Sequence, residues 1–437
     1  MNKRVLSAGT IGTVLEWYDF NLYSTASALV FARLFFPGDD SVLGTLASFA
    51  TFAVGFFFRP LGGVLLGNLG DRIGRRTVLM ISLVLMGTAT TLIGVLPTYG
   101  SIGFWAPVLL VILRAVQGMG AGAEYAGAIA LTTEHSVERR RGLFGSIPAM
   151  GIGLGNIAAT GILALVSSLS EEDFLYWGWR LPFLASLVVV GFGLIIRLRV
   201  PESEVFEATR KRGGIAKVPM LKLVRTAPKP LFLSFLANIG PNVAGYVPSV
   251  FSLTYLTQQV HADKSIGLNA LLVANTTGLV VTPIFGALCD RVNRRAVYLS
   301  GALFCALTSF PFFWLLDTGT ALGVTMAILL MLTVGDGAML GSQPALLAEA
   351  FPTQLRYSGV ALSRELSAAL IGGTAPLVAT ALYQAGGKSP WLVAIYMLVL
   401  YAVSGLGAAL LGAQRRYRIG DEVGGSPNTT VTEDVRR

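Results

Sequence analysis

Apolar stretches of roughly 20 residues, the length that an α-helix needs to cross the hydrocarbon core of a bilayer, recur along almost the whole chain. Shorter segments rich in charge, glycine and proline separate these stretches. The pattern predicts an all-α membrane protein with twelve transmembrane helices. We expect the spans at 5–32, 41–68, 76–97, 104–133, 143–169, 181–196, 231–260, 266–289, 296–316, 319–348, 357–386 and 390–413.

The composition agrees with this pattern, because 53% of the residues are hydrophobic and only 13% are charged. The mean hydropathy is +0.66, far above that of an ordinary soluble domain. The first apolar stretch resembles a signal peptide in its basic start, but Glu16 and Asp19 interrupt it and it is too long for an h-region. We therefore expect it to remain in the protein as the first helix.

The formal net charge of +9 is unevenly distributed along the chain. Of the 33 lysine and arginine residues, 26 lie in the tails and in the loops after even-numbered spans, against 4 in the loops after odd-numbered spans. Basic loops remain on the cytoplasmic side of a membrane. The distribution therefore predicts that both termini are cytoplasmic, and it explains the charge without a nucleic-acid partner. Residues 414–437 are polar and are expected to form a disordered cytoplasmic tail.

A ten-residue motif occurs twice, as GNLGDRIGRR at 67–76 and as GALCDRVNRR at 286–295, with an offset of 219 residues. Glu134 and Arg141 recur as Glu349 and Arg356 with an offset of 215 residues. The repetition predicts two six-helix pseudo-repeats, 1–196 and 231–413, joined by a basic cytoplasmic linker at 197–230. Parallel repeats of this kind place a substrate site between them, near the bilayer midplane.

The repeated motif has the residue types of a gating latch. An Asp at a helix junction can accept hydrogen bonds from Arg of a neighbouring helix, and such a pair can hold one face closed and release it when the bundles rock. The alternative is that these residues act only as positive-inside signals. The predicted latch residues are Gly67, Asp71, Arg72, Gly74, Arg75, Arg76, Glu134 and Arg141 in the first half, and Asp290, Arg291, Arg294, Arg295, Glu349 and Arg356 in the second.

Charged residues inside the predicted spans are candidates for function, because each costs about 2.5–3.5 kcal/mol at the bilayer centre. They are clustered, since seven of the twelve spans contain none. Clustering of this kind favours a polar pathway through the membrane. The eight residues are Glu16, Asp19, Arg59, Arg114, Glu124, Asp336, Arg364 and Glu365.

The first span carries Glu16, Asp19 and Tyr23 on one helical face, because they fall at positions i, i+3 and i+7. Carboxyl groups that are desolvated or close together have raised pKa values, a property that a proton carrier needs. We predict proton-coupling roles for Glu16, Asp19, Glu124 and Asp336.

The fourth span carries Arg114, Gln117 and Glu124 on one stripe, beside glycines that allow another helix to approach closely. Arg114 is either an anchor for an anionic substrate or the partner of Asp19 or Glu124 in neutral packing. Arg364 has the same two interpretations, with Glu365 or Asp336 as its partner. The predicted substrate-binding residues are Arg114, Gln117, Tyr23, Asn238, Asn242, Tyr246 and Arg364.

Asn238, Asn242 and Tyr246 fall at i, i+4 and i+8 of the seventh span, where Pro241 and Pro248 predict a broken helix facing a cavity. Hydrogen bonds inside the second bundle explain the same pattern, so both interpretations stand.

The sequence offers no sign of an enzyme, a cofactor or a metal site. His135 and His261 stand in separate loops, so no histidine pair is available to a metal. No nucleophile has a base beside it, and the glycine-rich run at 151–155 lacks the strand and the acidic residue of a dinucleotide site.

Five segments resemble the metabolite:proton symporter family of the major facilitator superfamily. They are Glu16-Trp17-Tyr18-Asp19-Phe20, the glycine-bounded run 55–63 with Arg59-Pro60, the stripe from Arg114 to Glu124, Trp177-Gly178-Trp179-Arg180, and Phe351-Pro352-Thr353 with Arg356. The resemblance covers nearly all of residues 5–413.

This resemblance implies proton-coupled uptake, through a bacterial inner membrane, of small carboxylates such as 2-oxoglutarate, citrate or shikimate, or of zwitterions such as proline and betaine. Asn293 departs from the superfamily pattern, in which glycine is usual at that place. The tail contains no heptad repeat, so it differs from the family members that end in a coiled coil.

The expected mechanism is alternating access: a substrate binds between the halves with Arg114 holding its anionic group, and protonation among Asp19, Glu16 and Glu124 neutralises the site before the carrier turns. Two other functions remain open, a proton-antiporting efflux transporter and a non-transporting nutrient receptor. The expected partners are a small-molecule substrate, a proton and the lipid bilayer, and the sequence indicates no obligatory protein partner.

Overall fold

The computed structural model describes residues 3–38, 41–73, 75–133, 141–198, 224–289, 291–351 and 353–411. These residues form helices and turns, and no strand occurs among them. The elements of residues 3–198 are α1 (Lys3–Ala26), η1 (Ser27–Phe31), α2 (Ala32–Phe35), α3 (Ser41–Ile73), α4 (Arg75–Val95), α5 (Tyr99–Ile102), α6 (Trp105–Thr133), α7 (Arg141–Val166), α8 (Glu171–Asp173), η3 (Phe174–Gly178) and α9 (Arg180–Leu198), where η marks a π-helical segment.

The elements of residues 228–411 continue the same pattern. They are α12 (Pro228–Tyr246), η4 (Val247–Phe251), α13 (Ser252–Gln258), α14 (Lys264–Cys289), α15 (Arg294–Asp317), α16 (Ala321–Leu329), η5 (Leu330–Asp336), α17 (Gly337–Ala348), α18 (Thr353–Ser367), η6 (Ala368–Gly372), α19 (Ala375–Ala385) and α20 (Trp391–Leu411).

These elements confirm the all-helical membrane fold. Among the described residues, eight helices are long and apolar enough to cross a membrane, or nine if Glu171–Gly178 and Arg180–Ile195 form one bent span. The three remaining predicted spans correspond to α1 continued by η1, to α7, and to α12 continued by η4 and α13. The structure is thus consistent with the predicted twelve.

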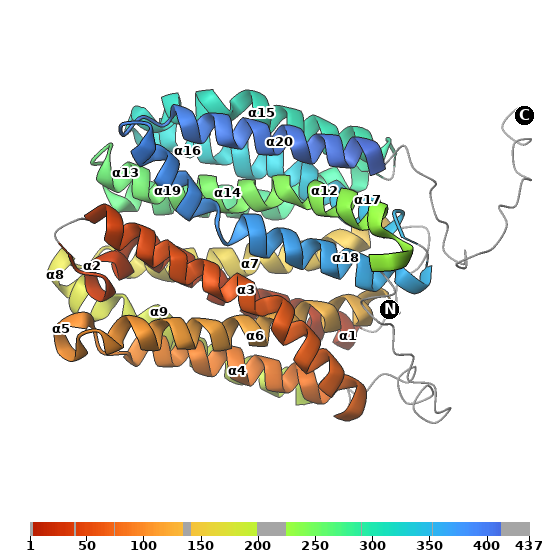
Figure 1. Cartoon of the computed structure of the whole chain (residues 1–437), viewed down its shortest axis with the longest axis horizontal. Helices are drawn as coiled ribbons and strands as arrows, with labels where there is room; N and C mark the ends of the chain where they lie inside the picture. The colour runs from red at the N-terminus through yellow and green to blue at the C-terminus, as the bar shows by residue number, and fades with distance from the viewer. Residues whose placement is uncertain are drawn as a thin grey trace, which may run out of the picture.

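The helices run side by side in alternating directions and form two groups (Figure 1). The helices α1–α9 lie together and are coloured red to yellow, and α12–α20 lie together and are coloured green to blue. The groups meet where α7 contacts α14 and α17, and where α3 contacts η6 and α19. We call the end of the bundle where α1 begins and α20 ends the terminal face, and the other end the opposite face. The linker 197–230 and the tail 414–437 lie mostly or wholly outside the described residues, and the two-repeat division stays a proposal.

Glycines bring α3 and α6 into backbone contact. A Cβ atom at Gly118 would lie 2.0 Å from the carbonyl oxygen of Gly55, and one at Gly122 would lie 1.9 Å from that of Arg59. Any larger residue at these positions would push the two helices apart. This close packing places Arg114, one turn before Gly118, directly against Gly55 of α3.

Pro241 interrupts the backbone hydrogen bonds of α12, because proline has no N–H to donate to the carbonyl of Ala237, four residues earlier. The freed carbonyl is buried, so it needs other donors. It accepts hydrogen bonds from the Tyr298 hydroxyl, from Ser404 Oγ at 3.3 Å and from Gln343 Nε2 at 3.5 Å. The break in α12 is therefore stabilised by α15, α17 and α20.

Candidate functional site

Arg114 lies at the centre of the first helical group with its side chain fully buried. Its Cζ atom is 4.3 Å from the ring centroid of Phe20, 4.2 Å from that of Tyr23 and 5.2 Å from that of Phe52. Desolvated contacts of this kind are worth about 2 kcal/mol each. Arg114 Nη1 also donates a hydrogen bond to Gln117 Oε1 at 2.5 Å. The guanidinium group is therefore fixed in orientation on three sides.

One edge of the Arg114 guanidinium group is free. Within the described part of the chain, its Nε and Nη2 atoms have no hydrogen-bond partner. These two atoms form the side edge that binds a carboxylate with two parallel hydrogen bonds. Gly55 lies next to this edge, since a Cβ atom there would be 2.4 Å from Nε. A buried charged donor without a partner is costly, so the arrangement favours an incoming anion.

Asp19 of α1 lies close to Arg114, and its exposed fraction is 2%. Its carboxyl group interacts with Thr90 of α4 and with Gln117, and Gln117 Nε2 donates to Thr90 Oγ1 at 2.7 Å. Among the described residues Asp19 forms no ion pair with Arg114, and Gln117 connects the two. Thr90 could not be predicted from the sequence, because one threonine in an apolar span has no distinctive pattern. We call Asp19, Thr90, Arg114 and Gln117 the Arg114 layer.

Arg59 of α3 contacts two carboxylates from two other helices. Its Nη2 atom lies 2.5 Å from Glu16 Oε1 of α1, its Nε atom lies 2.8 Å from Glu365 Oε2 of α18, and Nη2 also donates to Glu365 Oε1 at 3.2 Å. All three residues are buried. We call Glu16, Arg59 and Glu365 the Arg59 clamp. The sequence offered Glu365 or Asp336 as a possible partner of Arg364, and the structure shows the Glu365 carboxylate paired with Arg59.

The clamp lies nearer to the terminal face than the Arg114 layer. On α1, Glu16 precedes Asp19 by three residues, a rise of about 4.5 Å along a helix that begins at the terminal face. On α3, which runs toward the terminal face, Arg59 follows Gly55 by one turn. The ring of Phe20 lies against both cations, at 4.3 Å from Arg114 Cζ and 4.9 Å from Arg59 Cζ.

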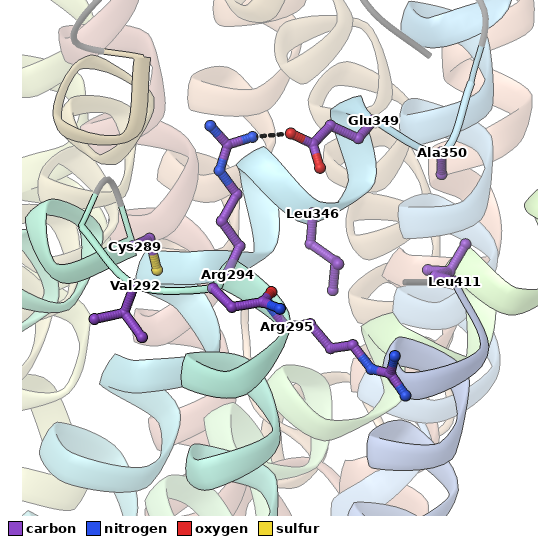
Figure 2. Close-up of a pocket in the computed structure, with 9 residues that line it drawn as sticks. Cys289, Val292, Arg294, Arg295, Leu346, Glu349, Ala350 and Leu411 are labelled. Atoms are coloured by element: carbon purple, nitrogen blue, oxygen red, sulfur yellow. Dashed lines mark hydrogen bonds and ion pairs between the residues drawn. The ribbon is translucent and has the colours of Figure 1, made fainter. Parts of the chain in front are cut away.

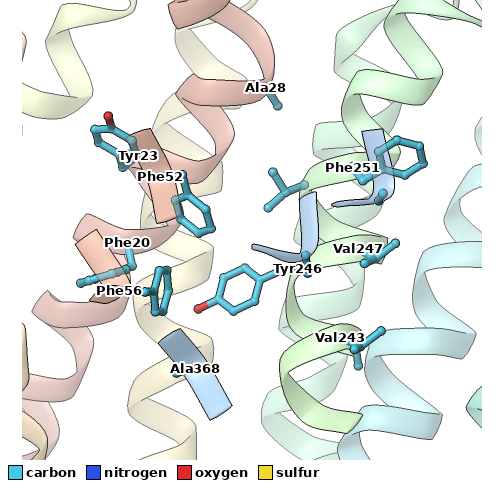
Figure 3. Close-up of a cluster of buried hydrophobic side chains, with 14 of the residues drawn as sticks. Phe20, Tyr23, Ala28, Phe52, Phe56, Val243, Tyr246, Val247, Phe251 and Ala368 are labelled. Carbon is cyan, nitrogen blue, oxygen red and sulfur yellow. The ribbon is translucent and has the colours of Figure 1, made fainter. Parts of the chain in front are cut away.

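Tyr23 and Tyr246 approach this region from different halves. The Tyr23 hydroxyl donates to Thr51 Oγ1 at 2.8 Å. Tyr246 extends from α12 toward the first group of helices, where its ring lies 5.5 Å from those of Phe52 and Phe56 (Figure 3). The second half therefore reaches the centre through an aromatic side chain.

The two predicted asparagines of α12 are bonded within the second half in this structure. Asn238 Nδ2 donates to Ser234 O at 2.7 Å, and Asn238 Oδ1 accepts from Gln343 at 3.1 Å. Asn242 Nδ2 bonds to the Asn238 carbonyl at 2.9 Å and to Ser367 Oγ at 3.1 Å. These contacts correspond to the alternative of core hydrogen bonding, and a substrate role for either residue stays a prediction.

The two other predicted proton carriers are Asp336 in the second half and Glu124 in the first. Asp336 is buried inside the second half, near Tyr298, Cys305 and Tyr401, and its Oδ1 atom has no partner among the described residues. It therefore lies among second-half side chains rather than in the Arg114 layer. The Glu124 side chain lies outside the described residues. Arg364 is half-buried beside Glu365, and its proposed substrate role stays a prediction.

The second copy of the predicted latch is visible in part. Arg294 at the start of α15 forms an ion pair with Glu349 at the end of α17 (Figure 2). With Asn293, Arg295 and Cys289, they line a pocket of about 370 Å³ at the terminal face. Arg291 is exposed in the same turn. Nothing is described of the surroundings of the other predicted latch residues, so the latch stays a prediction; these are Gly67, Asp71, Arg72, Gly74, Arg75, Arg76, Glu134, Arg141, Asp290 and Arg356.

The structure gives a local reason for Asn293, which stands where glycine is usual. Its side-chain Oδ1 accepts a hydrogen bond from the Arg295 backbone N–H at 3.0 Å and so caps the first turn of α15. Asn293→Ala is expected to lower the free energy of unfolding by about 1 kcal/mol, the usual cost of losing such a cap. Thermal unfolding of the purified protein measures the difference. Asn293→Asp, which retains the acceptor, serves as the control, and equal stability of all three proteins would contradict the capping role.

The chain is similar to known membrane transporters along most of its length. A family model described as the Major Facilitator Superfamily matches residues 9–376. The chain is 37% identical to the shikimate transporter of Escherichia coli (strain K12) over 417 residues, which cover 95% of each protein. It is 34% identical to the proline/betaine transporter of Salmonella typhimurium (strain LT2) over 415 residues, which cover 92% of this chain and 82% of that protein.

Solved structures give the same fold. A D-xylose-proton symporter superposes with a TM-score of 0.72 at 18% identity, covering 93% of this chain and 96% of that one. The partially occluded, inward-open xylose transporter of E. coli superposes with a TM-score of 0.73 at 16% identity, covering 94% and 97%. At these identities the likeness shows the arrangement of helices and nothing finer.

Proposed function

This chain belongs to the major facilitator superfamily and is a multi-pass membrane transporter rather than an enzyme, and we propose that it is a proton-coupled symporter for a small carboxylate. The observation that carries this proposal is the free Nε and Nη2 edge of Arg114, buried among aromatic rings. Shikimate, proline and betaine, which the relatives are named for, each bear a carboxylate that such an edge can bind.

The substrate is proposed to bind between Arg114 of the first half and Tyr246 of the second. Arg114 holds the carboxylate with two parallel hydrogen bonds, and Phe20 and Tyr23 shield the pair from water. These side chains are almost fully buried in this structure. Entry of the substrate then requires one face to open by movement of the two groups of helices.

Asp19 is proposed as the proton carrier of the Arg114 layer. It is buried, and the partners assigned to its carboxyl group are the neutral side chains of Thr90 and Gln117. A charged carboxylate without a bonded cation is costly in such a place. Glu16, by contrast, is neutralised by Arg59. Glu124 remains a second candidate from the sequence.

Charge balance explains why proton and substrate would move together. Among the described residues, the centre contains Arg59, Arg114 and Arg364, and these are balanced by Glu16, Asp19 and Glu365. A monocarboxylate adds one negative charge, and one proton removes it. The loaded carrier then turns through the membrane with its charge balance unchanged.

The excess of basic residues in the terminal-face loops supports a cytoplasmic location of both termini.

Proton flux into liposomes tests the proposal. Purified protein is reconstituted with a pH-sensitive dye inside the vesicles, and shikimate, other ring carboxylates, dicarboxylates, proline and betaine are added outside. Symport predicts that the lumen becomes acidic with one of these classes, without an imposed pH gradient. Alkalinisation on substrate entry would instead indicate a proton antiporter. Binding without any flux would indicate a receptor and overturn the proposal.

A further inference from the structure

The Arg59 clamp joins the two halves of the protein by a buried ion pair. Arg59 and Glu16 both belong to the first half, whereas Glu365 belongs to α18 of the second. Glu365 is held by two hydrogen bonds along the side edge of the guanidinium group, the same edge that is free in Arg114. The clamp lies between the Arg114 layer and the terminal face. As long as Arg59 and Glu365 are paired, the halves cannot separate on that side of the substrate.

We propose that Glu365 is a coupling residue, and that its protonation releases Arg59 and allows the terminal face to open. This inference rests on the proposed symport, because it gives the transported proton a second place of action. The proton comes from water at the opposite face by way of the Arg114 layer. When the proton binds Glu365, the two hydrogen bonds from Arg59 to this carboxylate break. The proton then leaves Glu365 for water at the terminal face, and the ion pair between Arg59 and Glu365 forms again.

The two carboxylates of the clamp have different consequences when protonated. If Glu365 takes the proton, Arg59 keeps Glu16 as its partner, and separation of the halves leaves no buried cation unpaired. If Glu16 takes the proton, Arg59 remains bound to Glu365 and the halves stay joined. A buried cation that lost all its partners would be strongly destabilising. Glu16 is therefore the permanent partner of Arg59, and Glu365 is the exchangeable one.

The clamp places two carboxylates around one guanidinium group. Arg59 is a single cation between two carboxylates, so the clamp itself has one negative charge in excess. The ionisable groups that face it are Tyr246 on α12, Arg364 on α18, Arg114 on α6 and Asp19 on α1. The ring of Phe20 lies against both Arg59 and Arg114. One proton on Glu365 removes the excess.

Distances between spin labels on the two halves test this coupling without any substrate. The labels are placed at Leu65 of α3 and Val292 before α15, which are 54% and 49% exposed. Cys289 and Cys305, which are buried, are replaced by alanine. Double electron–electron resonance then measures the distance distribution in lipid between pH 5 and pH 9. In the protein with native clamp residues, the ratio of open to closed populations is expected to rise as the pH falls, by up to about tenfold per pH unit for one linked proton.

Glu365→Gln and Glu16→Gln form a matched pair, because each removes one carboxylate charge from the same guanidinium group. Glu365→Gln is expected to show the long distance at every pH. Glu16→Gln is expected to remain closed at high pH and to retain the pH response. A pH-dependent opening that survives Glu365→Gln, or an equal opening in both variants, would overturn the proposal.

Two further results keep the test decisive if Glu365→Gln is poorly folded. The protein with native clamp residues must itself show the pH response, and a distance that is constant with pH contradicts the proposal. Glu365→Asp keeps the acid and is expected to restore the response. Because these measurements use no substrate, a negative result leaves the flux experiment unaffected, and a failure of symport in liposomes leaves the distances interpretable.

Discussion

Replacing Arg114 with alanine is expected to lower uptake by at least about 100-fold while the protein remains in the membrane. Removing one partner of a buried charged pair costs about 3–5 kcal/mol, which corresponds to a loss of this size or larger. The change also removes the hydrogen bond to Gln117 and the contacts with the aromatic rings of Phe20 and Tyr23, so the amount of folded protein in the membrane is measured separately. Uptake of the labelled substrate into vesicles, normalised to the amount of inserted protein, measures the effect.

Arg114→Lys is the informative control for this experiment. Lysine keeps the positive charge but cannot form two parallel hydrogen bonds to a carboxylate. If the side edge of Arg114 binds the substrate, the lysine variant retains only a small fraction of uptake, with a raised KM. Normal uptake by either variant would refute the assignment of Arg114 as the substrate anchor.

Gly118→Ala is expected to prevent correct packing of α3 against α6. The added Cβ atom would lie 2.0 Å from the Gly55 carbonyl oxygen, which is backbone and cannot rotate away. Overpacking of a well-packed interior costs about 1–3 kcal/mol, and a clash of two backbones lies at or above the upper end of this range. The variant should show a lower unfolding temperature in detergent and a smaller folded fraction in size-exclusion chromatography.

Gly278→Ala on α14 provides the matched control, because no atom lies within 4 Å of the position that its Cβ would occupy. It makes the same chemical change in the middle of another helix and should leave stability unchanged or slightly higher. Equal behaviour of the two variants would show that the contact between α3 and α6 does not limit stability.

The sequence predicted the parts of this protein that depend on local spacing. The lengths of apolar stretches gave the twelve spans, and helical periodicity put Asp19 beside Glu16 and Arg114 beside Gln117. The glycines near Gly118 likewise indicated a close helix contact, which the structure shows with α3.

The pairing of charges could not be predicted in this way. Arg59 and Glu365 are separated by 306 residues, and their contact depends on how the two halves pack together. The periodicity of apolar residues along one helix contains no information about that packing. The sequence left either Glu365 or Asp336 as a possible partner of Arg364, and it contained no sign that Glu365 would pair with Arg59. The partners of Asn238 and Asn242 could not be predicted for a similar reason. Helical spacing shows that the two residues share a face, but it does not show which side chains lie opposite that face.

The ring of Phe20 lies against both Arg114 and Arg59. One aromatic side chain therefore contacts both the place where a carboxylate would bind and the place where a proton would bind. An anion on Arg114 cancels the positive field that helps to hold the excess negative charge of Glu16 and Glu365, so occupancy of the one site makes protonation of the other more favourable. By thermodynamic reciprocity, a proton on Glu365 strengthens binding of the anion by the same factor. Binding of the substrate at Arg114 and binding of the proton at Glu365 would thus favour one another, and Phe20 contacts both sites.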